Sequence, residues 1–134
     1  MPYKRNAGFT LIEAMIALVI LGIIAAIAWP AYESQGERSR RTDAVKALSI
    51  AVTELERCQS DTGTYTGCGF TATSPDGYYD LTINRTADTF TLTATPDANQ
   101  IQANDTDCTT FTLNHLGERD YTGDATNIKR CWTQ

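Results

Sequence analysis

The chain has 134 residues, a mass of 14.7 kDa and a formal charge of −5 at pH 7. This length suits one small domain and excludes a multidomain enzyme. The acidic balance argues against a general nucleic-acid-binding protein, because phosphate binding requires clustered positive charge. The hydrophobic residues are unevenly distributed, since residues 9–29 are almost wholly apolar while the remainder is rich in Thr, Asp and Asn.

The first predicted element is an apolar run over residues 9–32 that contains a single charged side chain, Glu13. The run is long enough to cross a hydrocarbon core of about 30 Å, so it predicts a membrane helix. An ordinary secretory signal is cut at a small-residue site after its apolar stretch, and the residues after this run do not fit that pattern. We therefore expect the apolar helix to remain in the mature protein.

Glu13 is the unusual residue of this helix. A carboxylate inside a membrane span costs about 2.5 to 3.5 kcal/mol on insertion scales and is functional by default. Glu13 lies one helical turn after Phe9, so an amino group released at Phe9 would be its natural partner. The alternative interpretation is a shallow Glu13 whose carboxylate reaches the water interface.

The segment from Gly8 to Glu13, GFTLIE behind a short leader with Lys4 and Arg5, resembles the class III signal of type IV prepilins. The resemblance implies that a prepilin peptidase cuts between Gly8 and Phe9 and methylates the new amino group of Phe9. It also implies that Glu13 pairs with this amine during filament assembly. The basic residues at the two ends of the span nearly balance, so a cytoplasmic N-terminus is taken from the resemblance.

Two residues weaken the helix inside the apolar run. Pro30 lacks a backbone amide and is expected to kink the helix, and Gly22 costs roughly 1 kcal/mol relative to alanine. The resemblance to pilins implies that the helix can melt between Gly22 and Pro30 in the filament. A simple proline bend at the membrane surface is the alternative.

Beyond Pro30 an amphipathic pattern extends the helix to about Cys58. Its apolar stripe, which we expect to pack on a sheet, consists of Ala44, Leu48, Ala51 and Leu55. Its predicted polar face consists of Arg41, Lys46, Ser49, Thr53, Glu56 and Arg57. Residues 61–77 have a loop composition.

Alternating apolar residues predict two strands joined by a turn over residues 84–88, with Tyr79, Leu81, Ile83, Phe90, Leu92 and Ala94 on the buried face. A third strand is expected around residues 110–113 and a short fourth over 119–122, followed by a loop over 123–129. The predicted fold class is α+β, the type IV pilin fold, with a long N-terminal helix packed against a four-stranded antiparallel sheet. The predicted parts are a leader (1–8), a transmembrane and polymerisation half of the helix (9–30) and a periplasmic head (31–134).

Four cysteines, Cys58, Cys68, Cys108 and Cys131, indicate folding in an oxidising compartment. Sequence alone leaves three pairings open. The nearest-neighbour choice joins Cys58 to Cys68 and Cys108 to Cys131, and each disulfide would contribute roughly 2 to 4 kcal/mol. The stretch from Cys108 to Cys131 resembles the disulfide-bounded C-terminal region of type IV pilins. The cysteine spacings do not fit a zinc site.

The sequence predicts no catalytic residues, no cofactor and no metal site. The single histidine, His115, has no nucleophile motif with it, so we expect the protein not to be an enzyme. Asn104, Asp105 and Asp107, with Asp97 nearby, resemble calcium-binding loops of type II secretion pseudopilins, but the spacing lacks the glycine and glutamate of an EF-hand, and solvated loop charge is favoured.

A weak cationic patch is expected in the C-terminal tail. It would consist of Arg119, Lys129 and Arg130, and the neighbouring Asp120 and Asp124 dilute it. DNA is therefore a possible but less favoured partner, and a polar filament surface is preferred there.

The stretch TLNHLGER, Thr112 to Arg119, followed by Cys131 and Trp132, resembles the type IVa minor pilins of Gram-negative bacteria, and among them PilE. The resemblance implies a structural subunit that promotes pilus assembly and links a tip complex to the major pilin. Its partners would be other pilins, the prepilin peptidase and the inner-membrane assembly machinery. It would reside in the inner membrane and then in the pilus, and would serve functions such as twitching.

Three alternatives to this function remain open. The additional pair Cys58 and Cys68 departs from the minor pilin pattern and is reminiscent of cysteine-rich competence pilins that bind DNA. A major pilin and a type II secretion pseudopilin are the other two.

Overall fold

The structure is a computed structural model that describes residues 8–132; the predicted leader, with Lys4 and Arg5, lies almost wholly outside the described residues. The elements are α1 (Leu11–Thr62), β1 (Tyr79–Arg85), β2 (Phe90–Pro96), the 3₁₀ helix η1 (Ile101–Asn104), β3 (Thr110–Asn114), β4 (Arg119–Thr122) and α2 (Ile128–Cys131). The chain divides into two compact units between Gln35 and Gly36. The predicted boundary at residue 30 separates the membrane half of the helix from the periplasmic head, and it stays a prediction.

The first unit holds the apolar part of α1. Pro30 lies inside α1, and the stretch from Gly22 to Pro30 is helical in the single chain. Every residue from Gly8 to Gln35 is exposed. Melting between Gly22 and Pro30 concerns the assembled filament and remains a prediction.

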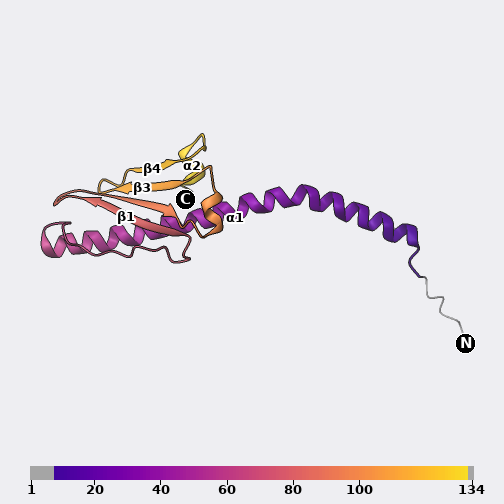
Figure 1. Ribbon diagram of the computed structural model, residues 1–134, viewed down its shortest axis with the longest axis horizontal. Helices are drawn as coiled ribbons and strands as arrows, with labels where there is room; N and C mark the ends of the chain where they lie inside the picture. The colour runs from indigo at the N-terminus through magenta and orange to yellow at the C-terminus, as the bar shows by residue number, and fades with distance from the viewer. Residues whose placement is uncertain (1–7, 133–134) are drawn as a thin grey trace, which may run out of the picture. The chain divides into compact units, whose positions relative to one another are not determined.

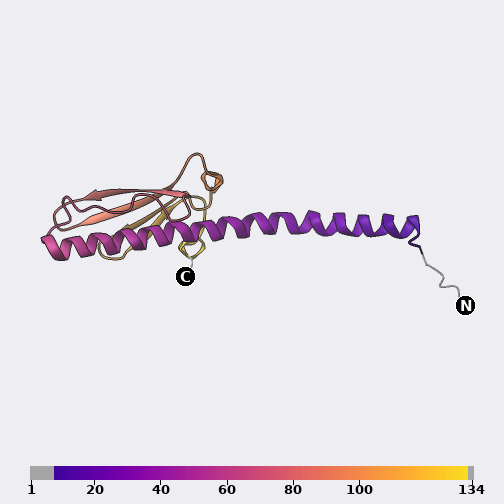
Figure 2. The same cartoon turned by 90° about the horizontal axis from the view of Figure 1, so that it is seen from below.

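The second unit, the head, packs the remaining part of α1 against one face of the sheet (Figures 1 and 2). The predicted apolar stripe is confirmed, because Ala44, Leu48, Ala51 and Leu55 are all buried. Aromatic rings fill the space between helix and sheet. Tyr79 and Phe111 meet edge to face at 5.7 Å between ring centroids, as do Tyr65 and Phe90 at 4.9 Å.

The sheet has the order β1-β2-β3-β4, and all neighbours are antiparallel. One row across the sheet, Leu81–Ala94–Phe111–Tyr121, lies on the core side, and the adjacent row, Thr82–Thr93–Thr112–Asp120, lies on the outer side. A shift by one residue would exchange these two rows, so core burial determines the register. The expected four-stranded antiparallel sheet is confirmed.

Two boundaries differ from the sequence prediction. The first turn is shorter, because Arg85 still pairs with Phe90 and the Thr86 amide donates to the Thr89 carbonyl at 2.9 Å. The helix α1 runs four residues beyond Cys58, to Thr62. It ends there because Gly63, with φ of 78°, adopts the left-handed conformation and its amide bonds to the Gln59 carbonyl at 2.7 Å.

The C-terminal stretch also contains more regular structure than expected. Residues 123–129 were predicted as a loop, yet α2 begins at Ile128. The Asn127 side chain caps this short helix by accepting a hydrogen bond from the Lys129 amide at 2.9 Å. The structure pairs Cys58 with Cys68 and Cys108 with Cys131, the nearest-neighbour arrangement, with Cα–Cα distances of 5.8 and 5.7 Å.

Candidate functional site

The segment that resembles a processing site lies at the start of α1. Gly8, Phe9 and Thr10 are non-helical and exposed, with Phe9 84% exposed. The bond between Gly8 and Phe9 is therefore outside the helical hydrogen-bond ladder. A peptidase needs an extended, accessible chain, so this placement is compatible with the predicted cut.

Thr10 caps α1. Its hydroxyl accepts a hydrogen bond from the Glu13 amide at 3.3 Å, and its carbonyl accepts one from the Ala14 amide at 3.2 Å. The spacing Thr-x-x-Glu is that of a capping box, in which Glu13 stands in the first turn near the positive end of the helix dipole. The sequence prediction missed this second role of Glu13, although the four-residue signal was visible.

The apolar part of α1 has no intramolecular cover. Among the described residues, one helix is long and apolar enough to cross a membrane, and the apolar stretch of that helix is wholly exposed in the chain by itself. So large an unbroken apolar surface is characteristic of contact with a membrane or with other subunits. Within the described chain, the exposed apolar side chains available for such contacts are those of residues 9–30.

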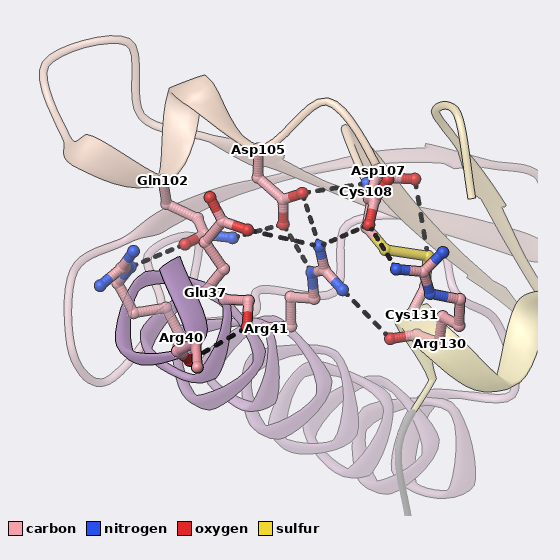
Figure 3. Close-up of polar contacts among 11 residues, drawn as sticks. Glu37, Arg40, Arg41, Gln102, Asp105, Asp107, Cys108, Arg130 and Cys131 are labelled. Atoms are coloured by element: carbon pink, nitrogen blue, oxygen red, sulfur yellow. Dashed lines mark hydrogen bonds and ion pairs between the residues drawn. A yellow bond between two sulfur atoms is a disulfide. The ribbon is translucent and has the colours of Figure 1, made fainter. Parts of the chain in front are cut away.

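A polar cluster inside the head connects three elements (Figure 3). Arg41 was predicted on the exposed polar face of α1, and this prediction is wrong, because its side chain is only 2% exposed. The guanidinium donates from Nε to Asp105 Oδ2 at 2.6 Å and from Nη2 to Asp105 Oδ1 at 2.7 Å. It also donates to the Arg130 carbonyl at 3.3 Å. These partners come from segments far along the chain, which helical periodicity does not reveal.

The remaining atoms of the cluster are also paired. Asp105 accepts hydrogen bonds from Gln102 Nε2 at 2.7 Å and from the Cys108 amide at 3.2 Å, and Arg40 Nε donates to Gln102 Oε1 at 2.8 Å. The hydrogen bond from Arg41 to Asp105 raises the pKa of the guanidinium further above its already high value. The cluster therefore fastens the η1 segment and the C-terminal disulfide to α1.

The candidate calcium loop is engaged by cations of the protein itself. Asp105 binds Arg41, and Asp107 lies 3.1 Å from Arg130 Nη2 and 3.6 Å from Arg41 Nη2. Within residues 8–132 the structure shows no cluster of His, Cys, Asp and Glu that is arranged to hold a metal ion. These loop carboxylates act as partners of arginine in this fold.

The three tail cations are not equivalent. Arg119 lies over the face of Trp132 at 5.3 Å from the ring centroid, whereas Arg130 is paired with Asp107. Lys129 is exposed on α2. His115 packs edge to face against Phe90 at 6.3 Å, so its position is that of a residue at the border of the core.

The comparisons with known proteins agree with this geometry. A family model described as "Type IV minor pilin ComP, DNA uptake sequence receptor" matches residues 30–112, and a prokaryotic N-terminal methylation motif matches residues 3–29. A type IV pilin from Shewanella oneidensis is 33% identical over 73% of this chain and 99% of that chain, with a TM-score of 0.53. The non-core minor pilin PilV from Neisseria meningitidis has the same fold, with 23% identity over 70% of this chain and 94% of that chain and a TM-score of 0.59.

The similarity to curated relatives is confined to a part of their length. A fimbrial protein of Pseudomonas aeruginosa is 47% identical over 53 residues, which are 40% of this chain and 34% of that protein. Fimbrial protein Q of Moraxella bovis is also 47% identical over 53 residues, which are 40% of this chain and 34% of that protein. The chain thus spans about a third of the length of the curated relatives it matches.

The long N-terminal helix, the four-stranded sheet and the methylation motif define a type IV pilin. Within this class, the chain belongs to the type IV minor pilin family of ComP. It has the N-terminal methylation motif of this class and a helix that is long and apolar enough to anchor it in a membrane.

Proposed function

We propose that this minor pilin promotes assembly of a type IV pilus and links a tip complex to the major pilin. The observation that carries the proposal is the apolar part of α1, which is exposed over its whole length and bears one charge, Glu13, in its first turn. Apolar burial among helices of neighbouring subunits would seat the subunit, and the carboxylate would set its axial position.

Maturation would precede assembly. A prepilin peptidase would cut between Gly8 and Phe9 on the cytoplasmic side and methylate the amino group of Phe9. The new amine would lie one helical turn from Glu13, within reach of an ion pair in an apolar environment. Before assembly the head would fold in the periplasm, where both disulfides are stable.

Quantitative mass spectrometry of sheared filaments tests the proposed function. We expect the mature chain at a small fraction of the major pilin, and we expect deletion of its gene to reduce the number of filaments. Presence as the dominant subunit would instead indicate a major pilin. Recovery only with a secretion system, and absence from filaments, would indicate a pseudopilin.

DNA uptake is the second candidate function, and one observation favours it. The family model that matches residues 30–112 is described as a DNA uptake sequence receptor. The exposed tail residues Arg119 and Lys129 are the cations that this chain would offer to phosphates, whereas Arg130 is already paired with Asp107. The family description and the second disulfide thus support a DNA-binding role beside the structural one.

A binding measurement with the full chain in detergent tests the second candidate. The probes are duplex fragments of the source strain's own genomic DNA and fragments of equal length from unrelated DNA. We expect tighter binding of the first set, with affinity that falls as salt rises. Lys129→Ala should weaken both sets alike, because a phosphate contact carries no sequence information. Equal and weak binding of both sets would reject a sequence receptor.

A further inference from the structure

The face of α1 that points away from the sheet carries a line of cations. Arg38, Lys46 and Arg57 are all exposed. Successive residues of an α-helix are rotated by about 100°, so these three side chains fall within about 100° of one another around the helix axis. Arg38 and Arg57 are about 29 Å apart along that axis. The exposed residues between them on this arc are uncharged, namely Ser39, Thr42, Ser49 and Thr53, and the exposed Asp61 lies one helical turn beyond Arg57. We call this surface the cationic ridge.

Two acidic residues of α1 beside the cationic ridge, Glu54 and Glu56, are hydrogen-bonded to the loop after α1. The carboxylate of Glu54 accepts hydrogen bonds from the Thr71 amide at 2.5 Å and the Thr71 hydroxyl at 2.8 Å. The carboxylate of Glu56 accepts one from the Tyr65 hydroxyl at 2.8 Å. The loop after α1 therefore engages both of these carboxylates, and the exposed Asp61 marks the end of the cationic ridge.

Among the described residues, the three cations of the ridge have no ionic partner. Within residues 8–132, the ion pairs involve only Arg41 and Arg130 as cations. A solvated arginine or lysine is ordinary at a surface. Three in a line, with the one intervening acid, Glu56, hydrogen-bonded to Tyr65, form a predominantly cationic surface that complements a partner of the other sign.

The rest of the head has the opposite charge. Residues 63–132 contain nine acidic and four basic side chains. The exposed acidic residues lie on the loops and the outer face of the sheet, namely Asp76, Asp80, Asp88, Glu118, Asp120 and Asp124. A molecule with a cationic and an acidic surface at different places can form head-to-tail contacts, which generate open helical filaments rather than closed dimers.

We propose that the cationic ridge binds an acidic head surface of a neighbouring pilin subunit in the filament. This inference rests on the proposed function, since it requires a subunit inside the pilus. Subunits that polymerise through residues 9–30 hold their heads at a high effective concentration, so contacts that are weak in solution suffice. The ridge then selects which acidic neighbour is adjacent and in which register.

The spacing of the cations fits carboxylates better than nucleic acid. Duplex DNA carries one negative charge per 1.7 Å of axis, whereas the cationic ridge presents three charges over about 29 Å. The ridge hydroxyls also donate to their own helix, from Ser49 to the Val45 carbonyl at 2.8 Å and from Thr53 to the Ser49 carbonyl at 2.9 Å. These hydroxyls therefore do not supply hydrogen-bond donors for a continuous row of phosphates.

The test reverses the ridge charges in the full-length protein in its native pilus system. The variant carries Arg38→Glu, Lys46→Glu and Arg57→Glu together, and a control variant carries Arg119→Glu and Lys129→Glu in the tail. All five side chains are exposed, so both variants should fold. We expect the ridge variant to be cleaved normally and its share in sheared filaments to fall by about fivefold or more, while the tail variant is incorporated like the wild type.

Photo-cross-linking identifies what the cationic ridge touches. A benzoylphenylalanine placed at Thr42 or Thr53 should form an adduct with an acidic peptide of another pilin in intact filaments. Cross-links to nucleic acid or lipid alone, or unchanged incorporation of the ridge variant, would overturn the inference. The proposed function fails differently, because the wild-type chain would then be missing from filaments altogether.

Discussion

Arg41 and Asp105 are 64 residues apart in the chain, yet their side chains form a two-pronged ion pair with distances of 2.6 and 2.7 Å, 2% and 1% exposed (Figure 3). The pair joins α1 to the η1 segment, and through the Cys108 amide it reaches the C-terminal disulfide. It fixes the path of a loop region that contributes few apolar side chains of its own.

Replacement of Arg41 should destabilise the head. Arg41→Met leaves Asp105 buried with an uncompensated charge, and breaking a buried pair in this way costs about 3 to 5 kcal/mol. Thermal unfolding of the full chain in detergent, followed by circular dichroism, measures the loss. Arg38→Met on the exposed face is the matched control, with an expected change within about 0.5 kcal/mol. Equal stability of the two variants would contradict a structural role for the pair.

The backbone at Gly123 provides a second structural prediction. Gly123 has φ of 133°, and a Cβ there would collide with the backbone carbonyl of Asp107, next to Cys108. Gly123→Ala should therefore cost more than about 2 kcal/mol, since backbone cannot move aside as a flexible side chain does. Gly117, with φ of 77°, has open space around it, so Gly117→Ala should cost only about 1 kcal/mol of conformational strain. A reversed order in chemical denaturation would contradict the close approach.

The buried hydroxyl of Tyr79 should make the folded state less stable at alkaline pH. Burial raises the pKa of its hydroxyl in the folded chain, so folding holds this proton more tightly than the unfolded chain does. The stability from this group is complete below the unfolded pKa of about 10 and is lost above it, by up to about 1.4 kcal/mol per pH unit. Tyr79→Phe should be near neutral at pH 7, since within residues 8–132 the hydroxyl makes no hydrogen bond.

The pH profile of the Tyr79→Phe variant checks this prediction. Unfolding free energies at pH 8 to 11 should fall less steeply than those of the wild type. Part of the slope should remain, because burial and the hydrogen bond to Glu56 also raise the pKa of Tyr65. Parallel curves for variant and wild type would exclude Tyr79 as a source of the alkaline sensitivity.

Glu13→Ala should separate processing from assembly. We expect normal cleavage, because the Gly8–Phe9 bond lies outside the helix, and a loss in filament incorporation of about tenfold or more. This magnitude follows from the roughly 1.5 to 3 kcal/mol of a hydrogen bond to a charged group. Thr10→Ala is the control for the shared capping role, since it removes the cap at about 1 kcal/mol but keeps the carboxylate. Identical incorporation of the two variants would show that Glu13 acts only as a capping residue.

Gly8→Ala should leave an uncut precursor in the inner membrane. An added side chain next to the scissile bond would hinder the approach of the peptidase, although Gly8 has open space in the isolated chain. Intact-mass spectrometry of membrane fractions distinguishes the precursor from the methylated mature chain. Gly22→Ala, also in open space, should be processed normally. Normal maturation of Gly8→Ala would reject the predicted cleavage site.

The helix and the sheet could be predicted from local patterns. The stripe Ala44, Leu48, Ala51 and Leu55 repeats at helical spacing, and Phe90, Leu92 and Ala94 alternate, so one burial face for each element follows from periodicity. The membrane segment is likewise determined by the composition of residues 9–32. The helix ends were less predictable, because they depend on caps such as Thr10 and Gly63 that occupy single positions.

The amino-acid sequence by itself therefore determined the class of this protein, since the apolar span, its single carboxylate at Glu13 and the two periodicities are all local properties. Only the tertiary structure decided which charged side chains are buried and which are exposed. Arg41 lies in a helix whose polar face it was expected to share, yet it is buried, whereas Arg38 and Lys46 on the same helix are exposed. The reason is physical: a buried arginine requires a carboxylate such as Asp105, and the fold alone brings that partner across the chain.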